Sequence, residues 1–566
     1  MINAHTAARA VVAACLFGAA CAHAQSPGPA PDLVLHGGKV VTVDARFSIA
    51  QAVAVRGDRI VAVGSDDAVR ALAGPATRQI DLRGRTVIPG LMDGHLHNAG
   101  GGPGVNLAHV RTIDELLQAV AARVKITPAG GLVISNGDWH EAQLKEKRLP
   151  HLKELDRIAP DHPVVLVRGG HEYIINNAAA RRWNITRDTA SPPGGEIGKD
   201  ADGELNGELV DTARSLVRLP PAAQLVREEI LAQQKILHAA GLTSIRIPGS
   251  FTFGSSPVEA WRLFKQLHAE GLLTLRVNFL FRITDYSSPE KVREQVRSWG
   301  ARQDEGDEWL RVDGVKTGSD GGFEGGLMRA VYDGIYSRGG VFRGIQVVPP
   351  ERHRMAVQEL NRLGWRVTTH VVGDLAADRV LDSYEAADKD VSLKGRRWAI
   401  EHLFIGRPEH FERIKGLDLV VSAQNHLYLA GPSVKKYWGS ERAQNVTPMR
   451  SFLDQGLMVG GGTDSPVIPH NPFWSIYHFV SRDTISDGTY GASQKITREE
   501  ALRVFTINNA RLTFQEQIKG SLEPGKLADL LVLPADLLTV PEKEIEGMRP
   551  LATMVGGRFV YTAPGF

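Results

Sequence analysis

The sequence predicts an α/β protein centred on a (β/α)8 TIM barrel, with a small β-sandwich and an inserted α/β subdomain. Three observations lead to this prediction. The middle of the chain alternates short apolar segments with helical stretches, which is typical of βα units. Both ends are rich in short strands, so we expect one sandwich built from the two termini. About 150 residues separate the first two barrel strands, far more than one ordinary crossover needs.

The sandwich strands are predicted by apolar runs that are separated by turn residues. In the N-terminal part the expected strands are 32–35, 39–43, 52–55, 59–63 and 80–82. In the C-terminal part they are 528–533 and 553–561. We therefore assign residues 31–84 and 517–566 to the sandwich.

Eight apolar segments are expected to form the barrel, which we assign to residues 85–516. They are 86–88, 242–247, 274–280, 310–316, 365–370, 398–402, 417–423 and 457–461. Helical patterns lie between them, for example at 228–240 and 350–364. Residues 105–235 have strand-like runs of their own, so we expect them to form an insertion over the barrel mouth.

Charge and composition argue against two classes of protein. The 66 Lys and Arg residues nearly balance the 64 Asp and Glu residues, and there is no basic stripe. Nucleic-acid binding is therefore not expected. With 43% hydrophobic and 23% charged residues, the chain has a globular rather than a disordered composition.

Residues 1–24 have the features of a bacterial-type signal peptide. Arg9 precedes an apolar run over 10–22, and Ala22-His23-Ala24 is a small-x-small cleavage site. The run is too short to span a bilayer, so no stable membrane span is expected. The prediction is an exported protein, periplasmic or secreted; a lipoprotein modified at Cys21 fits less well. Cleavage would remove both cysteines, Cys15 and Cys21, so no thiolate would remain as a metal ligand.

Six polar residues at the predicted carboxyl ends of barrel strands form the candidate site. His95 and His97 follow the first strand, and alternate residues of an extended segment point to the same side. Two imidazoles can therefore face one metal ion. The other four are Lys316, His370, His402 and Asp464, at the ends of the fourth, fifth, sixth and eighth strands. Barrel enzymes build their active sites at this end, and packing does not explain so many polar side chains.

These residues lie in motifs that resemble the amidohydrolase superfamily of metal-dependent hydrolases. The resemblance is strongest to amidohydrolase family 3, which includes N-substituted formamide deformylase-like proteins. The motifs are Val87-Ile-Pro-Gly-Leu-Met-Asp-Gly-His-Leu-His97, Gly314-Val-Lys316, His370-Val-Val-Gly-Asp374, Ile400-Glu-His402, Thr463-Asp-Ser-Pro466 and Gly520-Ser-Leu-Glu-Pro-Gly-Lys-Leu-Ala-Asp529. They extend over nearly the whole chain that would follow the signal peptide.

The resemblance implies a centre for two divalent metal ions. His95 and His97 would bind the more buried ion with Asp464, and His370 and His402 would bind the second. Lys316, carboxylated by carbon dioxide, would bridge them, since its carbamate supplies anionic oxygens that an ammonium lacks. Zinc is the expected metal because imidazole and carboxylate ligands suit it; iron, manganese or a single occupied site are alternatives.

The resemblance also implies a reaction. The metals would activate a water molecule for attack on a carbonyl. Asp464 would accept the proton of this water and pass it to the leaving nitrogen, with His402 as a second catalytic residue. The expected function is hydrolysis of a non-peptide C–N (amide-type) bond in a small molecule. Ester, lactone or phosphotriester hydrolysis at the same site is the alternative. A periplasmic metal- or solute-binding protein without catalysis is a rival of another class.

Substrate contacts are expected from the insertion and from the loop after the seventh strand. The candidates are Trp139, His140, His171, Tyr173 and His426. The chain departs from the family at Thr463, where relatives often have Ser, and at 424–426, where they often have Gln-Pro. These departures remove no proposed ligand but leave the substrate open. A homodimer is compatible with the family, although no residue proves it.

Overall fold

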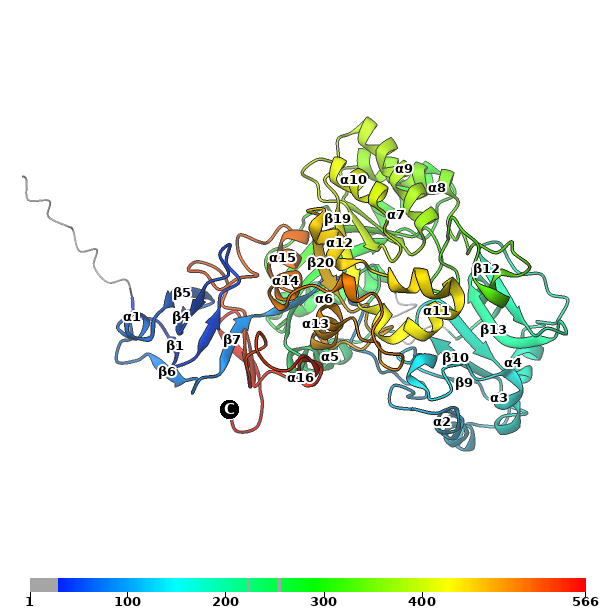
Figure 1. The fold of residues 1–566 in the computed structure, drawn as a ribbon, viewed down its shortest axis with the longest axis horizontal. Coiled ribbons are helices and arrows are strands. Elements are labelled where there is room, and N and C mark those ends of the chain that lie inside the picture. The colour runs from blue at the N-terminus through cyan, green and yellow to red at the C-terminus, as the bar shows by residue number, and fades with distance from the viewer. Residues whose placement is uncertain (1–28, 221–223, 252–255) are drawn as a thin grey trace, which may run out of the picture.

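The structure is a computed structural model that describes residues 29–220, 224–251 and 256–566. The predicted signal peptide, residues 1–24, lies outside the described residues. Figure 1 shows a small β-rich part at one end of the molecule, a barrel in the middle and a second α/β part at the other end. In the described residues, no helix is both long enough and apolar enough to cross a membrane.

Eight parallel strands form the central sheet, in the order β8-β14-β15-β16-β17-β18-β19-β20. Their bounds are β8 Leu91–Asp93, β14 Leu242–Pro248, β15 Arg276–Arg282, β16 Leu310–Thr317, β17 Val367–Val371, β18 Ala399–His402, β19 Val420–Gln424 and β20 Met458–Gly462. The two end strands meet through a hydrogen bond from Gly94 N to Gly461 O (2.8 Å), so the sheet nearly closes. The predicted (β/α)8 barrel is confirmed.

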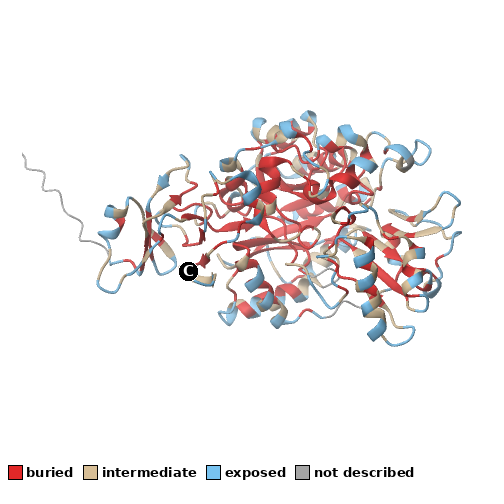
Figure 2. Cartoon of the chain, turned by 60° about the horizontal axis from the view of Figure 1, so that its bottom comes forward, coloured by how far each residue is buried: buried red, intermediate tan, exposed pale blue. Residues whose placement is uncertain are grey.

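Helices surround the barrel, and most of them lie between successive strands. They are α5 Arg227–Ala239, α6 Pro257–Ala269, α7 Pro289–Ser298, α8 Pro350–Arg362, α9 Asp374–Asp390, α10 Pro408–Gly416, α11 His426–Gln444, α12 Met449–Asp454, α13 Pro472–Ser481, α14 Arg498–Val504 and α15 Ile507–Leu512. Five of them begin with proline in the first turn, where its missing N–H is not needed. Figure 2 shows that the buried residues concentrate where these helices pack on the strands.

The first barrel strand is not the one that the sequence predicted. Thr86–Pro89 forms strand β7, which pairs with β2 and with the C-terminal strand β21. The barrel begins after Gly90, with β8. The interpretation of residues 86–88 as the first barrel strand is therefore wrong, because their hydrogen bonds go to the terminal strands. The remaining domain boundaries stay predictions.

The two ends of the chain together form two small sheets. Their orders are β5-β4-β1-β6 and β23-β22-β21-β7-β2-β3. The bounds are β1 Leu33–His36, β2 Lys39–Val41, β3 Ile49–Ala50, β4 Ala52–Arg56, β5 Arg59–Gly64, α1 Asp66–Arg70, β6 Arg78–Asp81, β21 Leu530–Leu533, α16 Glu542–Gly547, β22 Ala552–Val555 and β23 Arg558–Thr562. Leu35, Val53, Val87, Leu530 and Met554 share one buried core, which joins the two termini.

A five-stranded sheet, in the order β12-β13-β11-β10-β9, lies beyond the carboxyl ends of the barrel strands. The elements of this part are α2 Ile113–Ile126, β9 Val133–Ile134, α3 Leu152–Ile158, β10 Val164–Arg168, β11 Glu172–Ile175, α4 Asn177–Arg182, β12 Gly195–Lys199 and β13 Leu205–Asp211. Short 3-10 turns occur at Glu141–Gln143, Thr212–Leu216, Gly334–Ser337 and Ala492–Gln494. The sheet has its own apolar cores and lines a cavity together with the barrel.

Candidate metal centre

The six predicted ligands converge at one end of the barrel. They are His95, His97, Lys316, His370, His402 and Asp464, and all of them line one cavity of about 1260 Å³. Each lies at or just after the carboxyl end of its strand. Five are buried and the sixth, His370, is half-buried. Buried groups of this kind need partners, and a shared cation would satisfy several of them at once.

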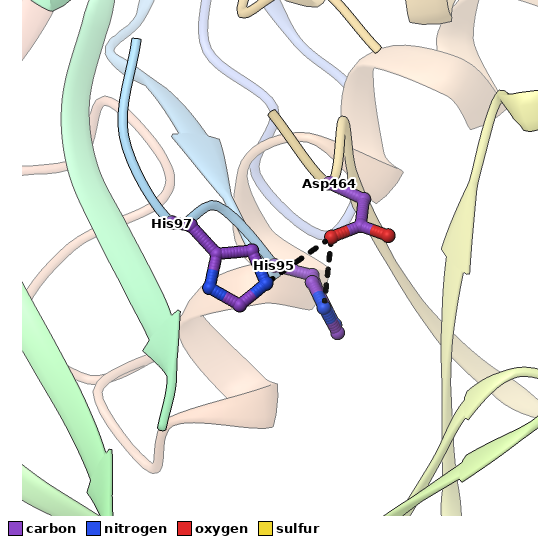
Figure 3. Close-up of side chains that lie close together, drawn as sticks. All are labelled: His95, His97 and Asp464. Atoms are coloured by element: carbon purple, nitrogen blue, oxygen red, sulfur yellow. Dashed lines mark ion pairs between the residues drawn. The ribbon is translucent and has the colours of Figure 1, made fainter. Parts of the chain in front are cut away.

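His95, His97 and Asp464 form the first group of potential ligands. Asp464 Oδ1 lies 3.3 Å from His95 Nε2 and 3.4 Å from His97 Nε2. Figure 3 shows this oxygen between the two imidazoles, while the other carboxylate oxygen points away. Two imidazoles and a carboxylate oxygen around one point are the donor set that zinc prefers. The arrangement fits a divalent cation.

The second group of potential ligands contains a histidine that the sequence had suggested for substrate binding. His402, His426 and Asp464 offer ligand atoms that all lie within 4.8 Å of one another. His426 Nε2 is 3.0 Å from Asp464 Oδ2. His370 contacts the His402 ring at a centroid distance of 4.7 Å, and its Nε2 lies 3.2 Å from Gly321 O. The role of His370 as a ligand stays a prediction.

Lys316 has the environment that carboxylation requires. Its Nζ is buried and has no hydrogen-bond partner in the part of the chain that the structure describes. Burial lowers its pKa to about 8, although the nearby carboxylates of Glu401 and Asp464 oppose this shift. A neutral amine is the form that reacts with carbon dioxide. The unpartnered nitrogen fits the predicted carbamate, and the carboxylation of Lys316 stays a prediction.

A buried chain of charges orients the first histidine. His95 Nδ1 lies 2.6 Å from Glu401 Oε2, and Arg246 Nη1 donates to Glu401 Oε1 at 2.6 Å. Arg246 Nε in turn donates to Asp313 Oδ2 at 2.5 Å. Although burial opposes ionisation, the charges of His95, Lys316 and Arg246 hold the pKa of Glu401 well below its usual range. The carboxylate is thus a fixed acceptor that leaves His95 Nε2 for a metal.

Two other histidines are oriented in the same way. His97 Nδ1 is 2.6 Å from Ser250 O, and His402 Nδ1 is 2.6 Å from Gln424 Oε1. Both acceptors select the tautomer with a proton on Nδ1, because a carbonyl oxygen only accepts. Nε2 of each ring is then a lone-pair donor for a metal. Outer contacts of this kind are typical of histidine ligands.

The backbone around Asp464 is held in an unusual conformation. Asp464 has φ 59° and His402 has φ 71°, in the left-handed region that residues other than glycine rarely adopt. The Asp93 carboxylate accepts hydrogen bonds from His95 N (2.9 Å) and Thr463 Oγ1 (2.7 Å), which joins the first and last strands of the barrel. Such strain is typical of functional sites.

The predicted substrate contacts all line the cavity but differ in their surroundings. Trp139 is buried and its Nε1 donates to Val167 O at 2.7 Å, so it mainly packs. His140 is buried beside Glu141. His171 stacks on His370 at 5.3 Å and pairs with Asp211 at 2.6 Å. Tyr173, Trp139, His140, His171 and His426 therefore stay candidates for substrate contact.

Two aromatic residues of the site are not among the contacts predicted from the sequence. Phe323 and Phe404 stack at 5.0 Å, and both contact the ring of His426 at 5.6 and 5.0 Å. Both also line the cavity and provide it with an apolar wall. Phe404 lies two residues after His402, and this closeness to the motif could have indicated that it belongs to the site. Phe323 lies in an irregular loop, and only the fold brings it here.

Comparison with known proteins agrees with this geometry. The model of the amidohydrolase family matches residues 78–561. The chain belongs to the amidohydrolase family. It is 30% identical to protein LONG AFTER FAR-RED 3 of Arabidopsis thaliana over 94% of this chain and 92% of that protein. It is 29% identical to the N-substituted formamide deformylase of Arthrobacter pascens, over 94% of this chain and 99% of the enzyme.

A solved structure shows the same fold. An uncharacterized metal-dependent hydrolase from Pyrococcus furiosus superposes with a TM-score of 0.63 at 25% identity, covering 90% of this chain and 100% of the hydrolase. The resemblance that the motifs predicted is confirmed. The protein is a metal-dependent hydrolase of the amidohydrolase superfamily.

Proposed function

We propose that the protein is an exported metal-dependent amidohydrolase that cleaves an amide-type C–N bond of a small molecule. One observation carries the proposal: Asp464 directs one carboxylate oxygen at His95 and His97 and the other at His426, inside the cavity. A carboxylate in this position can serve both as a ligand and as a base.

His95, His97, His402 and Asp464 would hold divalent metal ions, with His370 and the carbamate of Lys316 completing the set. Zinc suits these donors best. Bound metal ions of this kind lower the pKa of a water molecule and polarise a carbonyl oxygen. In the structure, the histidine partners described above already hold the Nε2 atoms toward the cavity, so little rearrangement is needed for binding.

Asp464 would move the proton in the reaction. Although burial opposes ionisation, the proximity of His95, His97 and His426 lowers the pKa of Asp464 well below its usual range. It is therefore ionised at neutral pH and can accept the proton of an attacking water. Delivery of that proton to the leaving nitrogen makes C–N cleavage feasible. His402, whose ligand nitrogen lies within 4.8 Å of an Asp464 carboxylate oxygen, would support this step.

An amide-type substrate is favoured by the relatives and by the cavity wall. The formamide deformylase from Arthrobacter pascens aligns over almost the whole chain. Phe323 and Phe404 offer an apolar surface next to His402 and His426, where an acyl or N-linked apolar group can pack.

Export is the second element of the proposal. The first 24 residues have the organisation of a signal peptide, so the enzyme would act in the periplasm or outside the cell. A homodimer remains compatible with the proposal.

The proposal is tested by release of amine from a panel of N-formyl and N-acyl amides, with esters and lactones alongside. The protein is purified with zinc and bicarbonate. Amide turnover that disappears on chelation of the metal supports the proposal. Turnover of esters or lactones alone contradicts it.

A further inference from the structure

Two arginines that line the cavity have side chains without a partner among the described residues. The guanidinium groups of Arg282 and Arg352 make neither a hydrogen bond nor an ion pair there. Other cavity arginines are engaged: Arg168 pairs with Glu141 at 2.8 Å, and Arg123 donates to Pro103 O at 3.0 Å. A guanidinium always carries its charge, so an unpaired one facing a cavity is available to an anion.

The first of these arginines lies beside the metal centre. Arg282 is the last residue of β15 and is paired in register with Lys316 of β16. Residues paired on neighbouring strands point to the same side of a sheet, at a strand spacing of about 4.8 Å. The ring of Phe281, one residue earlier, stacks on Trp299 after helix α7 at 4.8 Å and so points the other way. The Arg282 side chain therefore leaves the strand on the cavity side, next to Lys316.

A glycine provides the space for this side chain. Gly249 follows β14, and a Cβ at this position would lie 2.8 Å from Arg282 Cβ and 3.4 Å from Lys316 Cβ. Any larger residue would push the arginine away from its place. Gly249 also has φ +89°, so a side chain there would be strained as well as crowded.

The second arginine adds charge at the same rim. Arg352 lies in the first turn of α8. Hydrogen bonds from Ser287 lower the pKa of Asp285, in the loop after β15, and the charge of Arg352 acts in the same direction. Asp285 Oδ1 accepts a hydrogen bond from Ser287 N at 2.8 Å and forms no ion pair with either arginine in the described residues. Lys291 also acts on Asp285, so this carboxylate does not neutralise the two arginines on its own. An anionic ligand could therefore pair with them.

We propose that Arg282, assisted by Arg352, binds a carboxylate of the substrate. The preferred substrates would then be amide-type compounds with a carboxylate close to the scissile bond, such as N-acyl amino acids. This inference rests on the proposed amidohydrolase function and adds the class of substrate. The guanidinium fork matches the two oxygens of a carboxylate, and charge-assisted hydrogen bonds of this type are about twice as strong as neutral ones. The place of Arg282 beside Lys316 lets one small molecule reach both the arginine and the metal centre.

Binding is the direct test, because it does not depend on turnover. N-benzoylglycine and N-benzoylglycinamide are titrated calorimetrically into the zinc-loaded protein. These compounds differ only in the charged group. We expect the carboxylate to bind at least ~10-fold more tightly than the carboxamide, as charge-assisted hydrogen bonds would provide. Arg282→Gln should abolish this preference, Arg352→Gln should weaken it, and Arg282→Lys should restore part of it.

A matched control separates a specific site from general surface charge. Arg354 is exposed on the same helix as Arg352 but does not line the cavity. Arg354→Gln should therefore retain the full preference. Equal binding of the two ligands by the unmodified protein, or an unchanged preference in Arg282→Gln, would overturn the inference. Turnover of neutral amides is measured separately, so that the amidohydrolase function can fail or hold independently of this result.

Discussion

His95 Nδ1 and Glu401 Oε2 lie 2.6 Å apart in the floor of the barrel mouth, and both side chains are almost fully buried. This contact links His95, a candidate metal ligand that follows β8, to the residue before a second candidate, His402, in β18. It orients His95 so that Nε2 faces Asp464. The proposed metal centre therefore depends on a carboxylate that is not among its candidate ligands.

Replacing Glu401 should weaken metal binding without removing a ligand. In Glu401→Gln we expect the affinity for zinc to fall roughly 10- to 100-fold, as is usual when a partner of a metal-bound histidine is lost. Affinity is measured by competition with a chelator, and the unfolding temperature is followed to detect misfolding. Glu499→Gln, an exposed position on α14, is the control. Unchanged zinc affinity in a folded Glu401 variant would contradict this role.

The bridging role of Lys316 predicts a spectroscopic signal. Protein exchanged into ¹³C-bicarbonate should show one carbamate resonance, which Lys316→Met should lose together with part of the bound metal. Lys519 is also buried, with a pKa lowered to about 7 mainly by burial, but its Nζ donates to Ser244 Oγ at 2.8 Å. If the resonance persisted in Lys316→Met and disappeared in Lys519→Met, the carbamate would be on Lys519, and the proposed role of Lys316 would be contradicted.

Acid should destabilise the fold through buried neutral histidines. Burial lowers the pKa of His238 from 6.5 to about 4, so the folded state disfavours its protonation. The unfolded chain takes up the proton first. The contribution of His238 to the free energy of unfolding is therefore complete above pH 6.5 and is lost as the pH falls from 6.5 through about 4. The part lost between pH 7 and pH 5 is ~2 kcal/mol. The decrease in unfolding temperature over this range should be smaller in His238→Gln; an equal decrease would argue against it.

Export predicts a defined N-terminus. Mass spectrometry of the protein recovered from the periplasm or medium of a bacterial host should find a chain that begins at Gln25. Recovery of the intact chain from the cytoplasm alone would contradict the predicted signal peptide.

The sequence was sufficient for the barrel because eight apolar segments alternate with helical patterns, and polar residues end or follow five of them. It misplaced the first strand because Thr86–Pro89 and Leu91–Asp93 are separated only by Gly90, and both are apolar. Only pairing partners distinguish a terminal strand from a barrel strand, and one partner of β7, strand β21, lies near the other end of the chain.

The site was predicted in part. Residues at strand ends, such as His95 and His402, follow a pattern that can be read locally. His426 comes after a strand too, but its approach to Asp464 depends on the path of the loop before α11. Phe323 gave no usable signal, because an aromatic residue in a loop acquires a function only through its neighbours. Glu401 lies inside the Ile400-Glu-His402 motif, but its contact with His95 could be found only from the fold.

The most direct test of the account is the turnover of amides by the protein and its Asp464→Asn variant, both loaded with zinc. We expect amine release by the unmodified protein and a decrease in kcat of at least ~100-fold in the variant, the usual range for loss of a general acid–base group. Zinc content is measured in both, so that loss of a ligand is separated from loss of a base. Near-normal turnover by a zinc-loaded Asp464→Asn variant would contradict the central claim.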